Sequence, residues 1–184
     1  TRLGWIKKKQ REFEGQARQP QRQYISGETH FVFGKALRLL VKPVNGSKCA
    51  ILPEASDRLL MAVPLGSTTD QKAHWLSIWY RRQLRERAAP RMVKWSERLG
   101  VSEPRWGIRL MRTKWGSCNP DKGLVWLNLD LAKKPLAALD YVILHEMAHF
   151  VSPRHDDIFL NVLDRHMPGW RQIRADLNAL PLSE

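Results

Sequence analysis

Residues 141–155, YVILHEMAHFVSPRH, are the stretch that decides the fold of this chain. The residues before His145 are mostly apolar from position 136 onward, and more apolar residues follow it. A helix that is apolar on nearly all sides belongs in a protein core. Three ionisable side chains, those of His145, Glu146 and His149, nevertheless lie in its middle, and burying them without partners would be costly. The stretch therefore predicts a buried helix whose polar residues share a specific partner.

The spacing of the two histidines indicates that this partner is a metal ion. His145 and His149 are four residues apart, so on a helix they share one face, with Cβ atoms roughly 5–6 Å apart. Two imidazoles in that geometry can hold one divalent metal. Glu146 is the next residue round the helix, which matches the HExxH arrangement of a general base beside a zinc-bound water. The alternative interpretation is that the histidines are satisfied within the core or lie on the surface.

A catalytic zinc needs a third protein ligand, and His155 is the first candidate. The residue before a proline avoids the α region, so Ser152-Pro153 predicts that the helix ends near Val151 or Ser152. The chain can then turn and bring His155 back to the metal. If it does not, the next candidates are Asp156, Asp157 and His166.

Length and composition limit the class of protein. A chain of 184 residues with 43% hydrophobic residues predicts one folded domain, or one domain with a small appendage. The apolar runs are too short to span a bilayer, and no signal peptide is visible, so we expect a cytoplasmic protein without membrane contact. The chain starts at Thr1 rather than at methionine, which suggests that natural residues precede it. Cys49 and Cys118 match no metal-finger spacing and are interpreted as reduced thiols, with one disulfide as the alternative.

The net charge of +13 is concentrated in two segments. Residues 1–24 and residues 81–98 each carry seven lysines and arginines against two glutamates. Such a positive field attracts polyanions such as nucleotides, nucleic acid or an acidic partner. The alternative is that the two segments are solvated helix faces.

The order of the expected elements divides the chain into three parts. Residues 1–24 contain a basic N-terminal helix, and residues 28–66 read as a meander of about four antiparallel strands. Residues 69–184 form the helical, catalytic part. Within it we expect a helix capped by Thr68 or Thr69 and interrupted or kinked at Pro90, then strands at 106–111 and 124–129 around a loop at 113–123. The metal helix begins near residue 135, and two further helices follow, separated by a break at residues 166–169.

Several motifs, taken together, resemble a known family. They are WIKKK at 5–9, YISGE at 24–28, TKWGSC at 113–118, LN at 127–128, LDYV at 139–142, HEMAH at 145–149, His155, Phe159, RHMP at 165–168 and Trp170. In this respect the chain resembles the YgjP-like zinc metallopeptidases, which are related to the SprT-like and WLM zincins. The resemblance implies an α+β, zincin-like domain with an antiparallel or mixed sheet packed on the HExxH helix. It also implies that His145, His149 and His155 bind Zn²⁺ and that Glu146 is the catalytic base.

The loop at 113–123 and two later polar residues are the candidate substrate contacts. Arg112, Lys114 and Trp115 combine two cations with an indole, which would suit a phosphate-bearing or base-bearing substrate. The alternative is that this loop only closes a hairpin against the metal helix. Asn128 is a candidate for orienting a ligand, or for bridging backbone groups. His166 is a further candidate for the site, with a structural or surface role as the alternative.

The ligand set predicts metal-assisted hydrolysis but leaves the substrate open. A peptide substrate is favoured by the family resemblance and the zincin motif. A nucleoside triphosphate is the second candidate, because the resemblance also implies UTP pyrophosphatase activity and the chain is strongly basic. The third is a basic, metal-stabilised nucleic-acid-binding module, which would not need Glu146.

Overall fold

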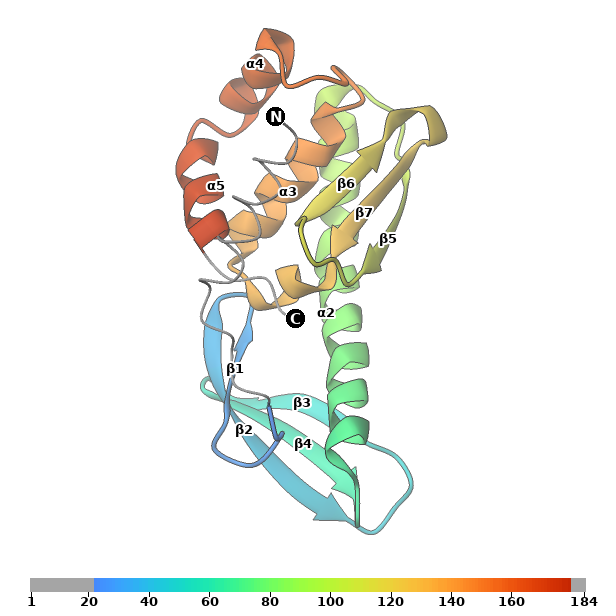
Figure 1. Cartoon of the computed structure of the whole chain (residues 1–184), viewed down its shortest axis with the longest axis vertical. Helices are drawn as coiled ribbons and strands as arrows, with labels where there is room; N and C mark the ends of the chain where they lie inside the picture. Colours follow the sequence, from blue (N-terminus) through green and yellow to red (C-terminus); the bar gives the residue numbers. More distant parts are fainter. Residues whose placement is uncertain (1–21, 180–184) are drawn as a thin grey trace, which may run out of the picture.

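The computed structural model describes residues 22–179 and contains two β-sheets joined by one long helix (Figure 1). The basic helix predicted near the N-terminus lies outside the described residues. No helix in the described part is long and apolar enough to cross a membrane.

The first sheet has four strands, but it is not the predicted antiparallel meander. Its strands are β1 (Thr29–Val32), β2 (Lys35–Val44), β3 (Ala50–Ala55) and β4 (Arg58–Pro64), in the order β1-β2-β4-β3. β4 pairs in parallel with β2 and antiparallel with β3, so β3 is displaced to the edge. The apolar content of the strands explains this order. β4 buries Leu59, Met61 and Val63, whereas β3 is mostly exposed and contains Pro53, a residue suited to an edge strand.

The helix α2 (Thr69–Leu99) runs from the first sheet to the second without a break (Figure 1). Of the two effects predicted for Pro90, an interruption or a kink, the interruption is therefore wrong. Thr68 caps its start, as predicted, and Gly100 ends it in the left-handed conformation. Pro90 is exposed, while the opposite face buries a continuous row of residues on both sides of it. This row consists of Leu84, Ala88, Met92 and Trp95. Packing along that face maintains the helix despite the missing backbone donor.

The second sheet lies against the helix that carries His145 and Glu146, and it contains a strand that the sequence did not reveal. Its strands are β5 (Arg105–Arg109), β6 (Gly116–Asn119) and β7 (Leu124–Asn128), in the order β5-β7-β6. The segment predicted as a loop therefore contains β6 and a short 3₁₀ helix, η1 (Pro120–Lys122). The sequence of β6, GSCN, has little intrinsic strand preference. Antiparallel pairing with β7 supplies the hydrogen bonds that hold it extended.

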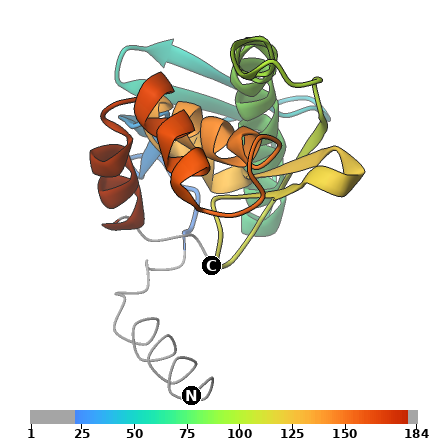
Figure 2. The same ribbon diagram turned by 90° about the horizontal axis from the view of Figure 1, so that it is seen from above.

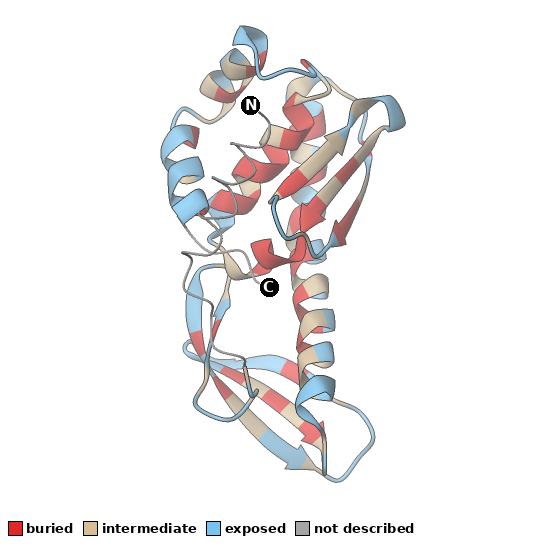
Figure 3. Cartoon of the chain, in the orientation of Figure 1, coloured by how far each residue is buried: buried red, intermediate tan, exposed pale blue. Residues whose placement is uncertain are grey.

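The C-terminal part is helical, and α3 (Leu136–Ala148) is its centre. A 3₁₀ helix, η2 (Leu129–Lys133), leads into α3, and α4 (Asp157–His166) and α5 (Trp170–Ala179) follow with the predicted break between them. Seen from above, α3 lies between α2 and α5 (Figure 2). Nine of its thirteen residues are buried, which confirms the core position predicted from its apolar sequence (Figure 3).

Candidate active site

Two of the three histidines lie at the C-terminal end of α3. His145 is in the last turn, and His149 is the C-cap residue, so regular helix ends about three residues earlier than predicted. Hydrogen bonds continue the turn beyond α3, because the N–H groups of Val151 and Ser152 both donate to the carbonyl of Ala148. The two histidines therefore keep the helical spacing that places both rings on one face.

The turn after α3 brings His155 to the same place. The hydroxyl of Ser152 is buried and lies 2.9 Å from the Asp156 carboxylate, which also accepts a hydrogen bond from the N–H of Phe159 and caps α4. These contacts fix the segment that carries His155. Phe159 packs against all three histidines, because its ring centroid lies 4.6–5.0 Å from each imidazole centroid.

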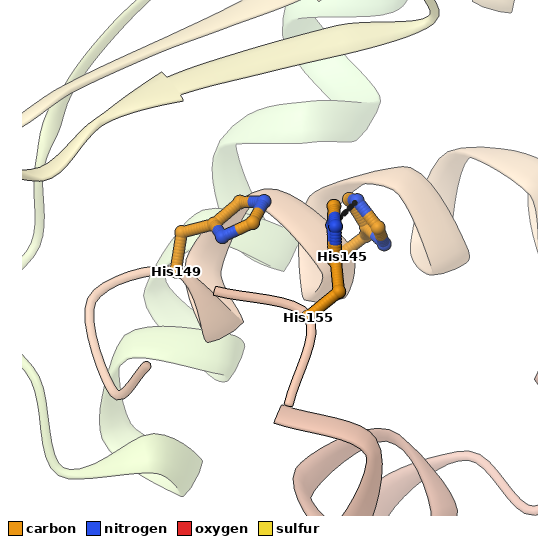
Figure 4. Close-up of side chains that lie close together, drawn as sticks. All are labelled: His145, His149 and His155. Carbon is orange, nitrogen blue, oxygen red and sulfur yellow. Dashed lines mark hydrogen bonds between the residues drawn. The ribbon is translucent and has the colours of Figure 1, made fainter. Parts of the chain in front are cut away.

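The three imidazoles have the spacing of a metal-binding site (Figure 4). His145, His149 and His155 each offer a ring nitrogen, and these atoms lie within 4.8 Å of one another. The Nε2 atoms of His145 and His155 are 3.2 Å apart. A tetrahedral zinc bound at about 2.0–2.1 Å would hold two such nitrogens about 3.3 Å apart. The donor set therefore fits a single small divalent metal.

The electrostatics of the cluster favour neutral, metal-binding rings. Burial, together with the charges of His149, His155 and Arg174, lowers the pKa of His145 to about 3. Burial also lowers the pKa of His149. Metal ligation requires the unprotonated imidazole. At neutral pH these two rings are already in that form, so a metal does not have to displace their protons.

Glu146 lies beside the histidines, enclosed between α3 and β6. The residue is 6% exposed, and among residues 22–179 its carboxylate has no hydrogen-bond partner. Burial raises the pKa of its carboxyl to about 7, while the charge of Lys114 acts in the opposite direction. A carboxylate with a pKa near the working pH, and with both oxygens free, is suited to accept a proton.

The absence of a side chain at Gly116 in β6 leaves room for the carboxylate of Glu146. A Cβ atom at this position would lie 2.6 Å from Oε1 of Glu146, so only glycine lets the strand approach the carboxylate this closely. We expect Gly116→Ala to leave the fold intact, because the flexible carboxylate moves aside. The variant should lower by about 100-fold the kcat of a hydrolysis in which this carboxylate takes part, because the carboxylate is displaced. Gly46→Ala is the matched control, since its added Cβ meets nothing within 4 Å. Equal kcat values for the two variants would show that the position of Glu146 does not matter.

A pocket of about 610 Å³ opens over this cluster. Its lining comes from β6 and the loop before it, from α3, and from the helices α4 and α5. Besides the histidines and Glu146, the lining includes Lys114, Trp115, Tyr141, Phe159, Trp170 and Arg174. The lining therefore includes two cations from separate segments, Lys114 just before β6 and Arg174 on α5.

Three of the predicted substrate contacts do not line this pocket. Arg112 is exposed outside it. Asn128 is fully buried, and its amide donates to the carbonyls of Met111 and Lys114, so it fixes the loop that carries Lys114. His166 packs edge-on against Trp95 of α2, with ring centroids 6.1 Å apart. Lys114 and Trp115 are the predicted contacts that the fold brings to this pocket.

Sequence reasoning assigned no role to Tyr141 and Arg174, which both line the pocket. A signal for Tyr141 was present, because it is four residues before His145 and therefore shares the face of the two helical histidines. The sequence analysis placed Tyr141 in an apolar run and in the LDYV motif at 139–142, without a role at the site. Arg174 carried no such signal, because its position depends on how α5 packs against α3.

Comparison with known proteins identifies the family of the chain. A family model described as YgjP-like, metallopeptidase domain, matches residues 1–180. The chain belongs to the YgjP-like metallopeptidase family. No curated protein matches the sequence. Among solved structures, the metallopeptidase zymogen abylysin of Pyrococcus abyssi is 18% identical, covering 49% of this chain and 90% of its own, with a TM-score of 0.46. The jannalysin zymogen of Methanocaldococcus jannaschii is 21% identical, covering 50% and 94%, also with a TM-score of 0.46.

Proposed function

We propose that this YgjP-like protein is a zinc-dependent peptidase in which His145, His149 and His155 hold the metal and Glu146 is the general base. The observation that carries the proposal is the convergence of three imidazoles within 4.8 Å, next to a buried carboxylate, in one pocket. Membership of a metallopeptidase family favours the peptide bond as the substrate.

When bound, a zinc ion supplies Lewis acidity and lowers the pKa of a bound water. The chain supplies the proton transfers. Glu146 accepts the proton of the attacking water and passes it to the nitrogen of the leaving amine, so one carboxylate serves both steps. Its enclosure by β6 keeps bulk water from solvating it, which preserves its basicity.

Nucleoside triphosphate hydrolysis is the competing proposal, and one observation favours it. Lys114 and Arg174 line the pocket, and neither has an ion pair within residues 22–179. Two cations beside a metal would also suit a phosphate chain. Membership of a metallopeptidase family does not point in that direction.

Binding of a polyanion by the basic segment 81–98 has weaker support. All seven of its cationic side chains have partners within the molecule. Arg81 donates to the carbonyl of Ile108, Arg82 pairs with Glu86, Arg85 and Arg87 stack on Trp106 and Phe33, Arg91 and Lys94 pair with Asp140, and Arg98 stacks on Trp95. These contacts favour a structural role for this helix face.

The test is metal analysis of purified protein followed by turnover assays. We expect about one zinc per chain, as in other catalytic zinc sites with three protein ligands. The zinc-loaded protein should cleave unfolded protein or quenched fluorescent peptides, and chelation should abolish this activity. Release of pyrophosphate from UTP without peptide cleavage would replace the peptidase by the competing proposal. Protein that binds no zinc after incubation with the metal would contradict both.

A further inference from the structure

Tyr141 is a buried polar residue on the metal-binding side of α3. It lies one turn before His145, and the two ring centroids are 5.7 Å apart. The residue is only 5% exposed, and it lines the same pocket as the histidines and Glu146. Tyr141 therefore places a hydroxyl group next to the side chains that are proposed to react.

The ring of Tyr141 is held in place while its hydroxyl is left without a partner. The ring stacks on Trp170 of α5, with centroids 6.1 Å apart and planes 5° from parallel. Buried tyrosine hydroxyls usually find a hydrogen-bond partner, as Tyr80 does by donating to the carbonyl of Phe31 at 2.8 Å. Within residues 22–179 the hydroxyl of Tyr141 makes no such bond, and it is not among the polar atoms sealed from solvent. Its donor is therefore free for a molecule in the pocket.

Tyr141 and Glu146 flank His145 on opposite sides. Each residue advances about 100° round an α-helix. Relative to His145, Glu146 is therefore displaced by about 100° in one direction and Tyr141 by about 40° in the other. Hydrolysis of an amide needs this separation, because a water attacks the carbonyl carbon while negative charge collects on the carbonyl oxygen. The base belongs beside the water, and a hydrogen-bond donor belongs beside the oxygen.

We propose that Tyr141 is a catalytic residue whose hydroxyl donates a hydrogen bond to the carbonyl oxygen of the scissile peptide bond. As the water oxygen bonds to the carbonyl carbon, the π electron pair moves to the carbonyl oxygen and Glu146 takes the proton of the water. The hydrogen bond from Tyr141 strengthens as that charge develops. When the pair returns, the C–N bond breaks and the amine nitrogen receives the proton from Glu146. This inference rests on the proposed peptidase function.

Tyr141→Phe tests the hydroxyl while keeping the ring that stacks on Trp170. We expect kcat for a peptide to fall by roughly 100- to 1000-fold, with KM and zinc content nearly unchanged. Binding of a phosphinic peptide, which mimics the tetrahedral intermediate, should weaken by a similar factor when measured by calorimetry. Tyr80→Phe is the matched control, because it removes a hydroxyl from an equally buried tyrosine outside the pocket. It should lower the melting temperature by roughly 2–4 °C and leave kcat unchanged.

The two proposals fail in different ways. A wild-type protein that binds zinc but cleaves no peptide would contradict the peptidase function itself. An active wild type with an equally active Tyr141→Phe variant would overturn the role of Tyr141 alone. A loss of kcat without weaker phosphinic peptide binding would also overturn it, because a purely structural role lowers activity without selecting for the tetrahedral form.

Discussion

Replacing Glu146 with glutamine is expected to abolish turnover while leaving the metal in place. The carboxylate is a proton acceptor rather than a ligand in the proposed mechanism, so Glu146→Gln should bind zinc like the wild type and lose roughly 10²–10⁴ in kcat. Glutamine has nearly the same shape and fits against Gly116, so the pocket is preserved. The measurements are zinc content and peptide cleavage under saturating metal. Glu103→Gln, which changes an exposed carboxylate, is the matched control and should be fully active.

The pH dependence of the wild type provides a second readout for Glu146. The base works in its ionised form, so activity should fall as the pH falls through the pKa of this carboxyl. Burial raises that pKa to about 7, and a bound divalent cation lowers it again, so the acidic limb should lie at or below about 7. Any residual activity of Glu146→Gln should lack this limb. If Glu146→Gln were active and its activity fell at the same acidic pH as that of the wild type, Glu146 would not be the base.

The melting temperature of Glu146→Gln shows whether the variant has lost only its catalytic base or also its folded structure. Because the folded-state pKa of Glu146 is raised above its ordinary value, the ionised carboxyl opposes folding increasingly as the pH rises from about 4.5 through 7. Glutamine carries no charge and removes that cost. The metal-free variant should therefore melt at the same temperature as the metal-free wild type at pH 8, or higher. A clearly lower melting temperature would attribute the loss of activity to misfolding.

The convergence of the three histidines was easier to predict from the sequence than the walls of the pocket around them, for physical reasons. His145, Glu146 and His149 belong to one helix, whose geometry is fixed by local periodicity, so their spacing alone placed them together. His155 was also predicted to join them, because Pro153 was expected to end the helix and let the chain turn back toward His145 and His149. The pocket walls are set by long-range packing. Lys114 reaches the site only because β6 pairs with β7 and lies on α3.

The errors in the predicted fold have the same origin. The parallel pairing of β2 with β4 depends on which strand buries more apolar surface, and local strand and turn signals do not encode this choice. The continuity of α2 through Pro90 depends on contacts along its buried face. In each case tertiary packing overrides a local preference.

Replacing His155 with alanine is expected to remove the metal and, with it, a measurable part of the stability of the protein. His155 is the only one of the three histidines outside α3 and its capping residue, and its ring nitrogen lies 3.2 Å from that of His145. Two remaining imidazoles do not make a complete zinc site, so zinc affinity should fall by at least about 100-fold. His74→Ala, an exposed histidine on α2, is the matched control and should bind zinc normally.

Thermal melting with and without zinc turns this loss into a quantitative test. A ligand at 100 times its Kd stabilises the folded state by about 2.7 kcal/mol, which raises the melting temperature of a protein of this size by roughly 5–10 °C. Wild type and His74→Ala should show that shift, and His155→Ala should show little of it. Without metal all three should melt at similar temperatures, because the core around α3 does not include the exposed ring of His155. An undiminished zinc shift in His155→Ala would place the third ligand elsewhere. Asp156 would then be a poor replacement, because its carboxylate already caps α4 and contacts Ser152.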